Sequence, residues 1–312
     1  MTGPVRSARA TNDQMPTFLI VGAAKCGTSS LHSYLDLHPE ISMSTPKEPR
    51  YFCRHIEDME DLEFVSDRAV YLSLFRPGTR HRGESTTTYS QSGRYPGAAA
   101  AIAREIKEPK IIYLVRDPVE RLVASVQQMG VAREPSRRRP YADALAAEAD
   151  PIRILAGNLE DPRSWHVDGG RYMTQINRFL EYFPKDSILV VDSEDLRFRR
   201  EETVNRVLSF LDLAPLDAPE ELAFEVNTAS NKFRDADLYL AFARSPFLRR
   251  ILDRVPGDLR RPAISYLRRL TGTKVSKLEL EPDLRQRLED LYRPEVEALR
   301  EFTGQQFSTW SV

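Results

Sequence analysis

Short apolar runs alternate with amphipathic stretches along most of the chain. The clearest runs lie at 18–22, 111–115 and 188–191, and each consists mainly of Ile, Leu and Val. Runs of this kind are typical of strands buried on both faces of a parallel sheet. Weaker patterns predict a strand ending at Met43, a helical segment over 56–76 and a strand end at 83–89. Apolar residues at helical spacing predict helices after Ser30 and over 96–106, 117–129, 172–183, 201–211 and 282–302.

This alternation predicts one α/β domain with a central parallel sheet and helices on both faces. In such a sheet the functional site is expected at the carboxyl ends of the strands. The chain has 312 residues, of which 41% are hydrophobic, and this is enough for one large domain. We expect the polar residues 1–16 to form a disordered tail and residues 17–312 to form the domain.

Charge and cysteine content narrow the classes of function. The net charge of −1 gives no support for binding nucleic acid or a membrane surface. We see neither the apolar segment of a signal peptide nor a stretch long enough to span a membrane. The cysteines Cys26 and Cys53 fit a reducing cytoplasm, and no His or Cys cluster has the spacing of metal ligands. We therefore expect a cytoplasmic protein without a metal.

The loop that follows the first strand has the composition of a phosphate-binding loop. Gly22 and Gly27 are separated by four residues, as in the Walker A pattern G-x-x-x-x-G-K-[ST], and a helix follows. The position after Gly27 is Thr28 rather than lysine, and a lysine lies inside the loop at Lys25. Backbone N–H groups and the positive end of the helix dipole bind anions in such loops. A lysine inside the loop suits a 5′-phosphate that carries one further transferable group.

The segment K-x-G-T-[ST]-x-L after a first strand resembles the loop of sulfotransferases that use 3′-phosphoadenosine 5′-phosphosulfate (PAPS). The resemblance is to the heparan-sulfate-type and related bacterial enzymes, and it implies a single domain of the P-loop type. It also implies that Lys25 stabilises charge on the departing phosphate. The remaining residues implied to hold the 5′-phosphosulfate are Cys26, Gly27, Thr28, Ser29 and Ser30.

The segment that begins at Arg116 resembles the 3′-phosphate motif of the same family. There a strand-end arginine and a serine eight positions later bind the nucleotide. Arginine suits this role because its planar fork grips phosphate with two hydrogen bonds. Eight positions after Arg116 the chain has Ala124, and the serine follows at Ser125. A salt bridge from Arg116 to Asp117 or Glu120 is the alternative reading.

Lys47-Glu-Pro-Arg-Tyr-Phe52 resembles the family segment that carries the catalytic glutamate. We expect Glu48 to accept the proton of the acceptor during transfer. The prolines that bracket the pair stiffen the loop and favour extended backbone at Glu48. Arg50 and His55 follow Glu48 and are candidates for contact with the acceptor, although exposed charges more often face solvent.

A further segment, Gly83-Glu-Ser-Thr-Thr-Thr-Tyr89, resembles the family pattern E-K-[ST]-P-x-Y, with Ser85 in place of the lysine. Glu84 is therefore the second candidate for the base and a candidate for acceptor binding. Nearer the C-terminus, Lys232 and Arg234 lie where the family has a basic loop over the 3′-phosphate.

The resemblance implies transfer of a sulfuryl group from PAPS to a hydroxyl or amine of a small-molecule, glycolipid or glycan acceptor. A P-loop kinase or NTPase is the alternative, and it would need a lysine after Gly27 and a magnesium-binding carboxylate such as Asp117 or Asp192. Nucleotide binding without catalysis is a third possibility, supported by the residues found at 85 and 124.

Overall fold

A computed structural model of the protein describes residues 15–54, 64–93, 95–131, 165–216, 219–223, 233–234, 273–274 and 280–312. Its centre is a five-stranded parallel sheet with the strand order β2-β3-β1-β4-β5. The strands are β1 (Phe18–Gly22), β2 (Ile41–Met43), β3 (His81–Ser85), β4 (Lys110–Val115) and β5 (Ile188–Asp192). The predicted parallel sheet is confirmed.

The first strand lies at the centre of the sheet because its side chains are apolar on both faces. Phe18, Leu19, Ile20 and Val21 have no exposed surface. Leu19 pairs with Glu84 of β3 on one side and with Ile111 of β4 on the other. The chain builds β2 and β3 on one side of β1 before it crosses to β4 and β5, so the strand order reverses at β1. A ligand site is expected at the carboxyl end of the strands at such a reversal.

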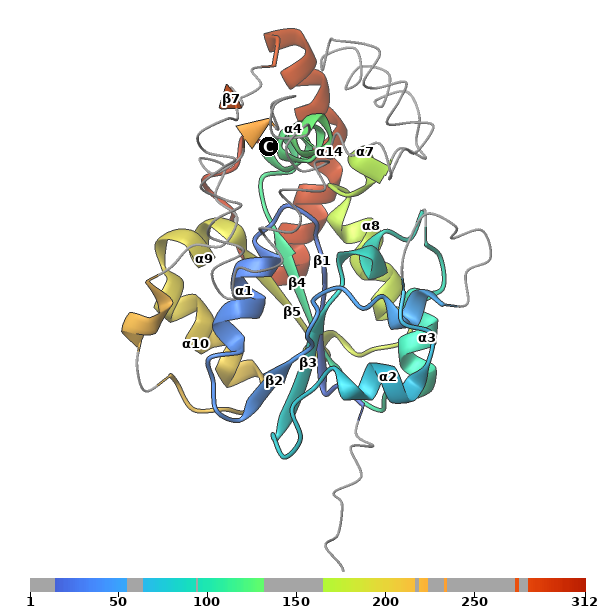
Figure 1. Ribbon diagram of the computed structural model, residues 1–312. Coiled ribbons are helices and arrows are strands. Elements are labelled where there is room, and N and C mark those ends of the chain that lie inside the picture. Colours follow the sequence, from blue (N-terminus) through green and yellow to red (C-terminus); the bar gives the residue numbers. More distant parts are fainter. Residues whose placement is uncertain are drawn as a thin grey trace, which may run out of the picture.

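Helices cover both faces of the sheet, as predicted (Figure 1). One face carries α1 (Thr28–Leu35), α9 (Ser193–Phe198) and α10 (Arg200–Phe210), and the other carries α2 (Arg68–Ser73), α3 (Ala98–Glu105) and α8 (Tyr172–Leu180). Shorter 3₁₀ turns lie at η1 (Tyr51–Cys53), η2 (Thr87–Ser90), η4 (Lys185–Ser187) and η5 (Pro219–Leu222). The helical segment predicted over 56–76 is shorter in the structure, since α2 begins at Arg68 and residues 55–63 lie outside the described part.

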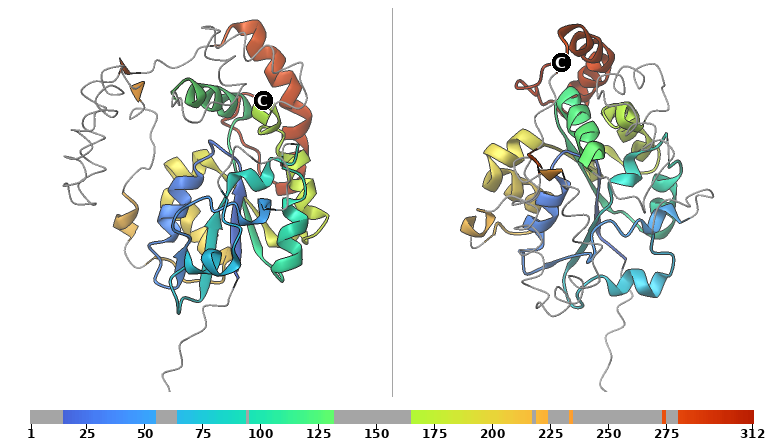
Figure 2. Two further views of the ribbon diagram at one scale, coloured as in Figure 1. Left: turned by 45° about the vertical axis from the view of Figure 1, so that its right-hand side comes forward. Right: turned by 45° about the horizontal axis from the view of Figure 1, so that its top comes forward.

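A group of helices lies beyond the carboxyl ends of the strands (Figure 2). It consists of α4 (Pro118–Val131), α7 (Trp165–Asp168) and the long α14 (Pro282–Thr303), which packs on α4 and α8. The short strands β6 (Phe233–Arg234) and β7 (Thr273–Lys274) form an antiparallel pair. The expected tail over 1–16 stays a prediction, because residues 1–14 are not described. None of the helices in the described ranges is long and apolar enough to cross a membrane.

The helix predicted over 117–129 is confirmed as α4, and Asp117 caps its start. The Asp117 carboxylate accepts hydrogen bonds from the N–H groups of Val119 at 2.9 Å and Glu120 at 3.0 Å. Its other oxygen accepts the N–H of Ser311 at 2.6 Å, which brings the C-terminal segment to the end of β4. Trp310 stacks on Phe307 there and lies near the ring of Tyr172. One carboxylate thus caps α4 and anchors the end of the chain.

Candidate active site

The loop between β1 and α1 is held in a fixed shape by backbone contacts. The Ala23 N–H donates to the Leu114 carbonyl of β4 at 2.7 Å. Lys25 and Gly27 have positive φ angles of 74° and 91°, in the left-handed region. Glycine adopts this conformation without strain, whereas Lys25 is held in it by the surrounding loop. The loop therefore turns sharply into α1 and directs its N–H groups toward the carboxyl end of β1.

We expected the backbone N–H groups of residues 26–30 to face the donor. In the structure two of them, those of Cys26 and Ser30, already have partners within the loop. The Cys26 N–H donates to the Ala23 carbonyl at 3.3 Å, and the Ser30 N–H donates to the Gly27 carbonyl at 3.0 Å. These bonds close the loop and begin the helix. The N–H groups of residues 27–29 have no hydrogen-bond partner in the described part of the chain. They are the N-terminal amides of α1 that can bind an anion.

A tyrosine joins the phosphate loop to the end of β4. The Cys26 side chain is buried, with its Sγ 3.8 Å from the Tyr172 hydroxyl. That hydroxyl donates to the Arg116 carbonyl at 2.6 Å and lies 3.3 Å from the Arg116 N–H. Burial raises the pKa of the Cys26 thiol to about 11, so it stays protonated and acts as a packing group. Tyr172 fixes the position of Arg116 relative to the loop.

Arg116 does not form the salt bridges that were its alternative explanation. Asp117 is occupied by backbone N–H groups, and Glu120 pairs with Arg285 at 2.9 Å. Within the described ranges the Arg116 guanidinium has no ion-pair partner. It is partly exposed at the carboxyl end of β4. An unpaired guanidinium beside a phosphate loop is suited to bind a second phosphate.

Ser125 lies elsewhere. Its side chain is buried, and its hydroxyl lies 3.0 Å from Nδ1 of His166, the residue after Trp165 in α7. A helical residue one position beyond the family's serine points about 100° away around the helix axis. Ser125 thus joins α4 to α7 in this structure, and its expected role on the 3′-phosphate stays a prediction.

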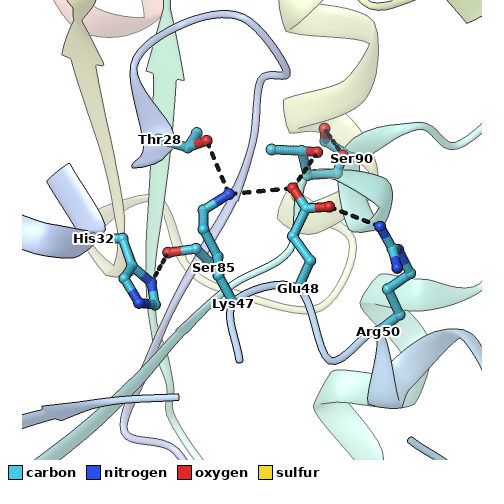
Figure 3. A network of polar contacts seen from close by, with 8 residues as sticks. Thr28, His32, Lys47, Glu48, Arg50, Ser85 and Ser90 are labelled. Carbon is cyan, nitrogen blue, oxygen red and sulfur yellow. Dashed lines mark hydrogen bonds and ion pairs between the residues drawn. The ribbon is translucent and has the colours of Figure 1, made fainter. Parts of the chain in front are cut away.

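Glu48 lies beside the phosphate loop in a network of charged groups (Figure 3). Its Oε1 is 3.1 Å from Lys47 Nζ, and its Oε2 accepts a hydrogen bond from Arg50 at 2.8 Å. Lys47 Nζ also lies 3.4 Å from the Thr28 hydroxyl at the start of α1. The Thr87 hydroxyl of η2 donates to Glu48 Oε1 at 3.3 Å. Lys47 therefore connects the carboxylate directly to the loop that is expected to hold the donor.

The backbone at Glu48 differs from the expected extended form. Its φ is 62°, in the left-handed region, although a proline follows. The Glu48 N–H donates to the Ser85 carbonyl at 3.1 Å, which ties this loop to the end of β3. Left-handed backbone at such a residue costs about 1–3 kcal/mol and persists where its surroundings fix it. The tether to β3 and the ion pairs hold the Glu48 side chain toward α1.

Opposing effects set the ionisation of Glu48. Partial burial alone would raise its pKa, but the positive charges of Lys47 and Arg50 outweigh burial and hold the pKa below its usual value. Glu48 is therefore ionised at neutral pH and able to accept a proton. Arg50, a candidate for acceptor contact, lies at the carboxylate of the candidate base.

Glu84 has the opposite environment. Its carboxyl has no exposed surface and accepts a hydrogen bond from the Tyr71 hydroxyl at 2.7 Å. Tyr71 stacks on Tyr51 with ring centroids 4.1 Å apart, which closes the space around the carboxyl. Burial raises the pKa of Glu84 to about 7. Contrary to our expectation, Glu84 has no surface with which to contact an acceptor.

The carboxylates considered for magnesium in the alternative reading serve as helix caps. Asp117 caps α4, and Asp192 at the end of β5 accepts the N–H of Glu194 in α9 at 3.1 Å. Burial raises the pKa of Asp192 to about 6. Neither arrangement resembles a carboxylate that faces the phosphates of a nucleotide.

Some expected site residues are not tested by the structure. His55 and Lys232 lie outside the described residues. Arg234 belongs to β6, which lies against α4, but its side chain is not described. In the other direction, sequence reasoning did not assign Lys47 or Tyr172 to the site. Lys47 adjoins Glu48, so a search for cations around the candidate base would have found it.

The raised pKa of Glu84 predicts a pH-dependent stability. Because the folded state holds the Glu84 proton more tightly than the unfolded state, its contribution is fully present below about pH 4.5 and is lost as the pH rises through about 7. Urea unfolding of the wild type and of Glu84→Gln across this range should show the wild type losing up to about 3 kcal/mol relative to the variant. Asp192 titrates in both proteins and cancels. If the free energies of unfolding of the two proteins change with pH in parallel, the pKa of Glu84 is not raised in the folded state.

Comparison with known proteins agrees with this geometry. The model of the sulfotransferase domain family matches residues 15–250. The bifunctional heparan sulfate N-deacetylase/N-sulfotransferase 1 of Caenorhabditis elegans is 25% identical over 218 residues, covering 66% of this chain and 23% of that protein. Carbohydrate sulfotransferase 15 of Mus musculus is 24% identical over 270 residues, covering 72% of this chain and 48% of that protein. The chain thus spans less than half the length of these relatives.

A solved sulfotransferase from Alicyclobacillus acidocaldarius has the same fold. It superposes with a TM-score of 0.59 at 24% sequence identity and covers 96% of this chain and 100% of that one. The family match extends over most of the chain, from before β1 to beyond β6. The chain belongs to the sulfotransferase domain family.

Proposed function

We propose that this protein transfers a sulfuryl group from PAPS to a hydroxyl or amine of a glycan, glycolipid or small-molecule acceptor. One observation carries the proposal: the Glu48 carboxylate is joined through Lys47 to Thr28, the first residue of the helix behind the phosphate loop. A proton acceptor and an anion-binding loop therefore lie on either side of one cation. Sulfuryl transfer needs these groups close together.

Groups at the carboxyl ends of β1 and β4 support PAPS as the sulfuryl donor. The amides of residues 27–29 are available for a 5′-phosphosulfate, and Lys25 lies within the same loop. The Arg116 guanidinium has no ion-pair partner in the described ranges and is suited to a 3′-phosphate. Tyr172 holds Arg116 at a fixed place relative to the loop. A nucleotide with phosphates on both sides of its ribose matches this arrangement of charges.

The chemical step assigns one task to each group. Glu48 accepts the proton of the acceptor hydroxyl or amine as the acceptor's oxygen or nitrogen forms its bond to sulfur. The bond between sulfur and the bridging oxygen of the 5′-phosphate breaks, and its electron pair stays on that phosphate. Lys25 and the loop amides stabilise the charge that develops there. The products are the sulfated acceptor and 3′-phosphoadenosine 5′-phosphate (PAP).

The acceptor class is proposed from the charges around Glu48 and from the relatives. Lys47 and Arg50 flank the carboxylate, so positive charge surrounds the place where an acceptor would meet it. The relatives named above are a heparan sulfate N-sulfotransferase and a carbohydrate sulfotransferase. These observations support an acceptor that offers a hydroxyl or an amine, a soluble glycan among them. A cytoplasmic location remains a prediction, compatible with the free thiols Cys26 and Cys53.

Nucleotide binding separates this proposal from a P-loop NTPase. In calorimetric titrations, PAP should bind to the wild type and ATP with magnesium should bind far more weakly. Arg116→Ala should weaken PAP binding by roughly 1.5–3 kcal/mol, the range for hydrogen bonds to charged groups. Binding of adenosine 5′-phosphate should barely change. A preference for ATP with magnesium would contradict the proposal, and equal losses for both adenosine nucleotides would show that Arg116 does not read the 3′-phosphate.

The role of Glu48 predicts a separate effect on turnover. Glu48→Gln keeps the size of the side chain but removes the proton acceptor, so kcat should fall by about 10²-fold or more. Glu181→Gln is the matched control, since it also removes a carboxylate paired to an arginine, here Arg178 at the C-terminal end of α8. Steady-state kinetics with labelled PAPS measure both variants. Turnover within a few-fold of the wild type in Glu48→Gln would remove Glu48 from the mechanism.

A further inference from the structure

Lys47 occupies a position that the proposed reaction does not yet explain. Its Nζ lies 3.1 Å from Glu48 Oε1 and 3.4 Å from the Thr28 hydroxyl, so one ammonium group touches both the base and the loop helix. Its side chain is 22% exposed, so it is not sealed inside the protein. Arg50 approaches the other oxygen of Glu48 and lies on the far side of the carboxylate from Thr28 (Figure 3).

The geometry of in-line transfer indicates which part of the donor would lie near Lys47. The acceptor must meet sulfur on the side opposite the departing phosphate, so the base and the phosphate loop flank the transferring group. Lys47 is the cation that lies between Glu48 and Thr28. Its ammonium group has three N–H donors, of which Glu48 and Thr28 use two in this structure. The charge of Lys47 and its one remaining donor can therefore serve a further anionic ligand placed between Glu48 and Thr28.

The neighbouring side chains His32 and Ser85 carry no positive charge at neutral pH. His32 lies one turn after Thr28 in α1, and its Nδ1 is 2.9 Å from the Ser85 hydroxyl. Burial and then the charge of Lys47 lower the pKa of His32 to about 4, so its ring is neutral near pH 7. Ser85 is neutral as well. Of the three side chains Lys47, His32 and Ser85, Lys47 is therefore the one that carries a positive charge beside Thr28.

We propose that Lys47 is a second cation of the donor site, which binds the transferring sulfuryl group while Glu48 and Thr28 hold it in place. The inference rests on the proposed use of PAPS and assigns a specific group of the donor to a specific side chain. It implies that Lys47 distinguishes PAPS from PAP, because PAP lacks the sulfuryl group. Lys25 and the loop amides would contact the phosphate that both ligands share.

Calorimetric titration with PAPS and with PAP, without acceptor, tests this assignment. The set is the wild type, Lys47→Met, Lys47→Arg and the control Lys107→Met. Lys107 is an exposed lysine that precedes the amino end of β4, whereas the site lies at the carboxyl ends of the strands. Lys47→Met should weaken PAPS by about 10- to 100-fold, the range for a charged hydrogen bond, and PAP by less than about 3-fold. Lys47→Arg should recover most of the PAPS affinity, and Lys107→Met should match the wild type.

A second pair of variants separates direct binding from neutralisation of Glu48. Lys47→Met leaves the Glu48 carboxylate without one of its cations, and this alone could repel the donor. The comparison is therefore repeated between Glu48→Gln and the double variant Lys47→Met with Glu48→Gln. If Lys47 binds the sulfuryl group, the double variant should still bind PAPS about 10-fold more weakly than Glu48→Gln.

Distinct results overturn the proposal. Equal losses for PAPS and PAP in Lys47→Met, or no loss for either, would show that Lys47 does not contact the sulfuryl group. Equal PAPS affinity in the double variant and in Glu48→Gln would show that Lys47 acts only by neutralising the carboxylate. If the wild type binds neither ligand, the donor assignment itself fails, and the Lys47 proposal fails with it.

Discussion

The hydrogen bond from the Glu48 N–H to the Ser85 carbonyl is the contact on which the candidate site depends. It ties the loop after β2 to the end of β3, and β3 pairs directly with β1. The phosphate loop follows β1, so one backbone bond and one strand pairing place the candidate base beside the candidate donor loop. On the other side, β4 pairs with β1 and ends at Arg116. The central position of β1 therefore brings together groups that are far apart in the sequence.

Charge then gives the two glutamates different roles. Glu48 and Glu84 both lie close to the phosphate loop in the fold, yet Glu48 is paired with cations and Glu84 is enclosed by tyrosines. A general base works best with a pKa near the working pH, and the raised pKa of Glu84 would suit that role if acceptor could reach it. Glu48 is partly exposed and Glu84 is not, so accessibility to an acceptor favours Glu48 as the candidate base.

The sequence predicted the parts of the fold that local pattern determines. Uninterrupted apolar residues marked β1, β4 and β5, and the Asp117-Pro118 pair marked the start of α4. It could not predict the surroundings of Glu84, because burial of a charged residue in a strand depends on tyrosines brought in from other elements, Tyr71 from α2 and Tyr51 from η1. The contact between Lys47 and Thr28 and the left-handed backbone of Glu48 also depend on how β2 and β3 pack. The contact of Ser125 with His166 was not predicted either, because spacing along a helix does not reveal which neighbour a serine faces.

A crystal structure of this chain with PAP would test the central claim most directly. The account predicts the 5′-phosphate within hydrogen-bond distance, about 3 Å, of the amides of residues 27–29, and the 3′-phosphate on the Arg116 guanidinium. The Glu48 carboxylate should then face the open side of the 5′-phosphate, across from the ribose. A 5′-phosphate bound away from α1, or Glu48 turned away from it, would contradict the account.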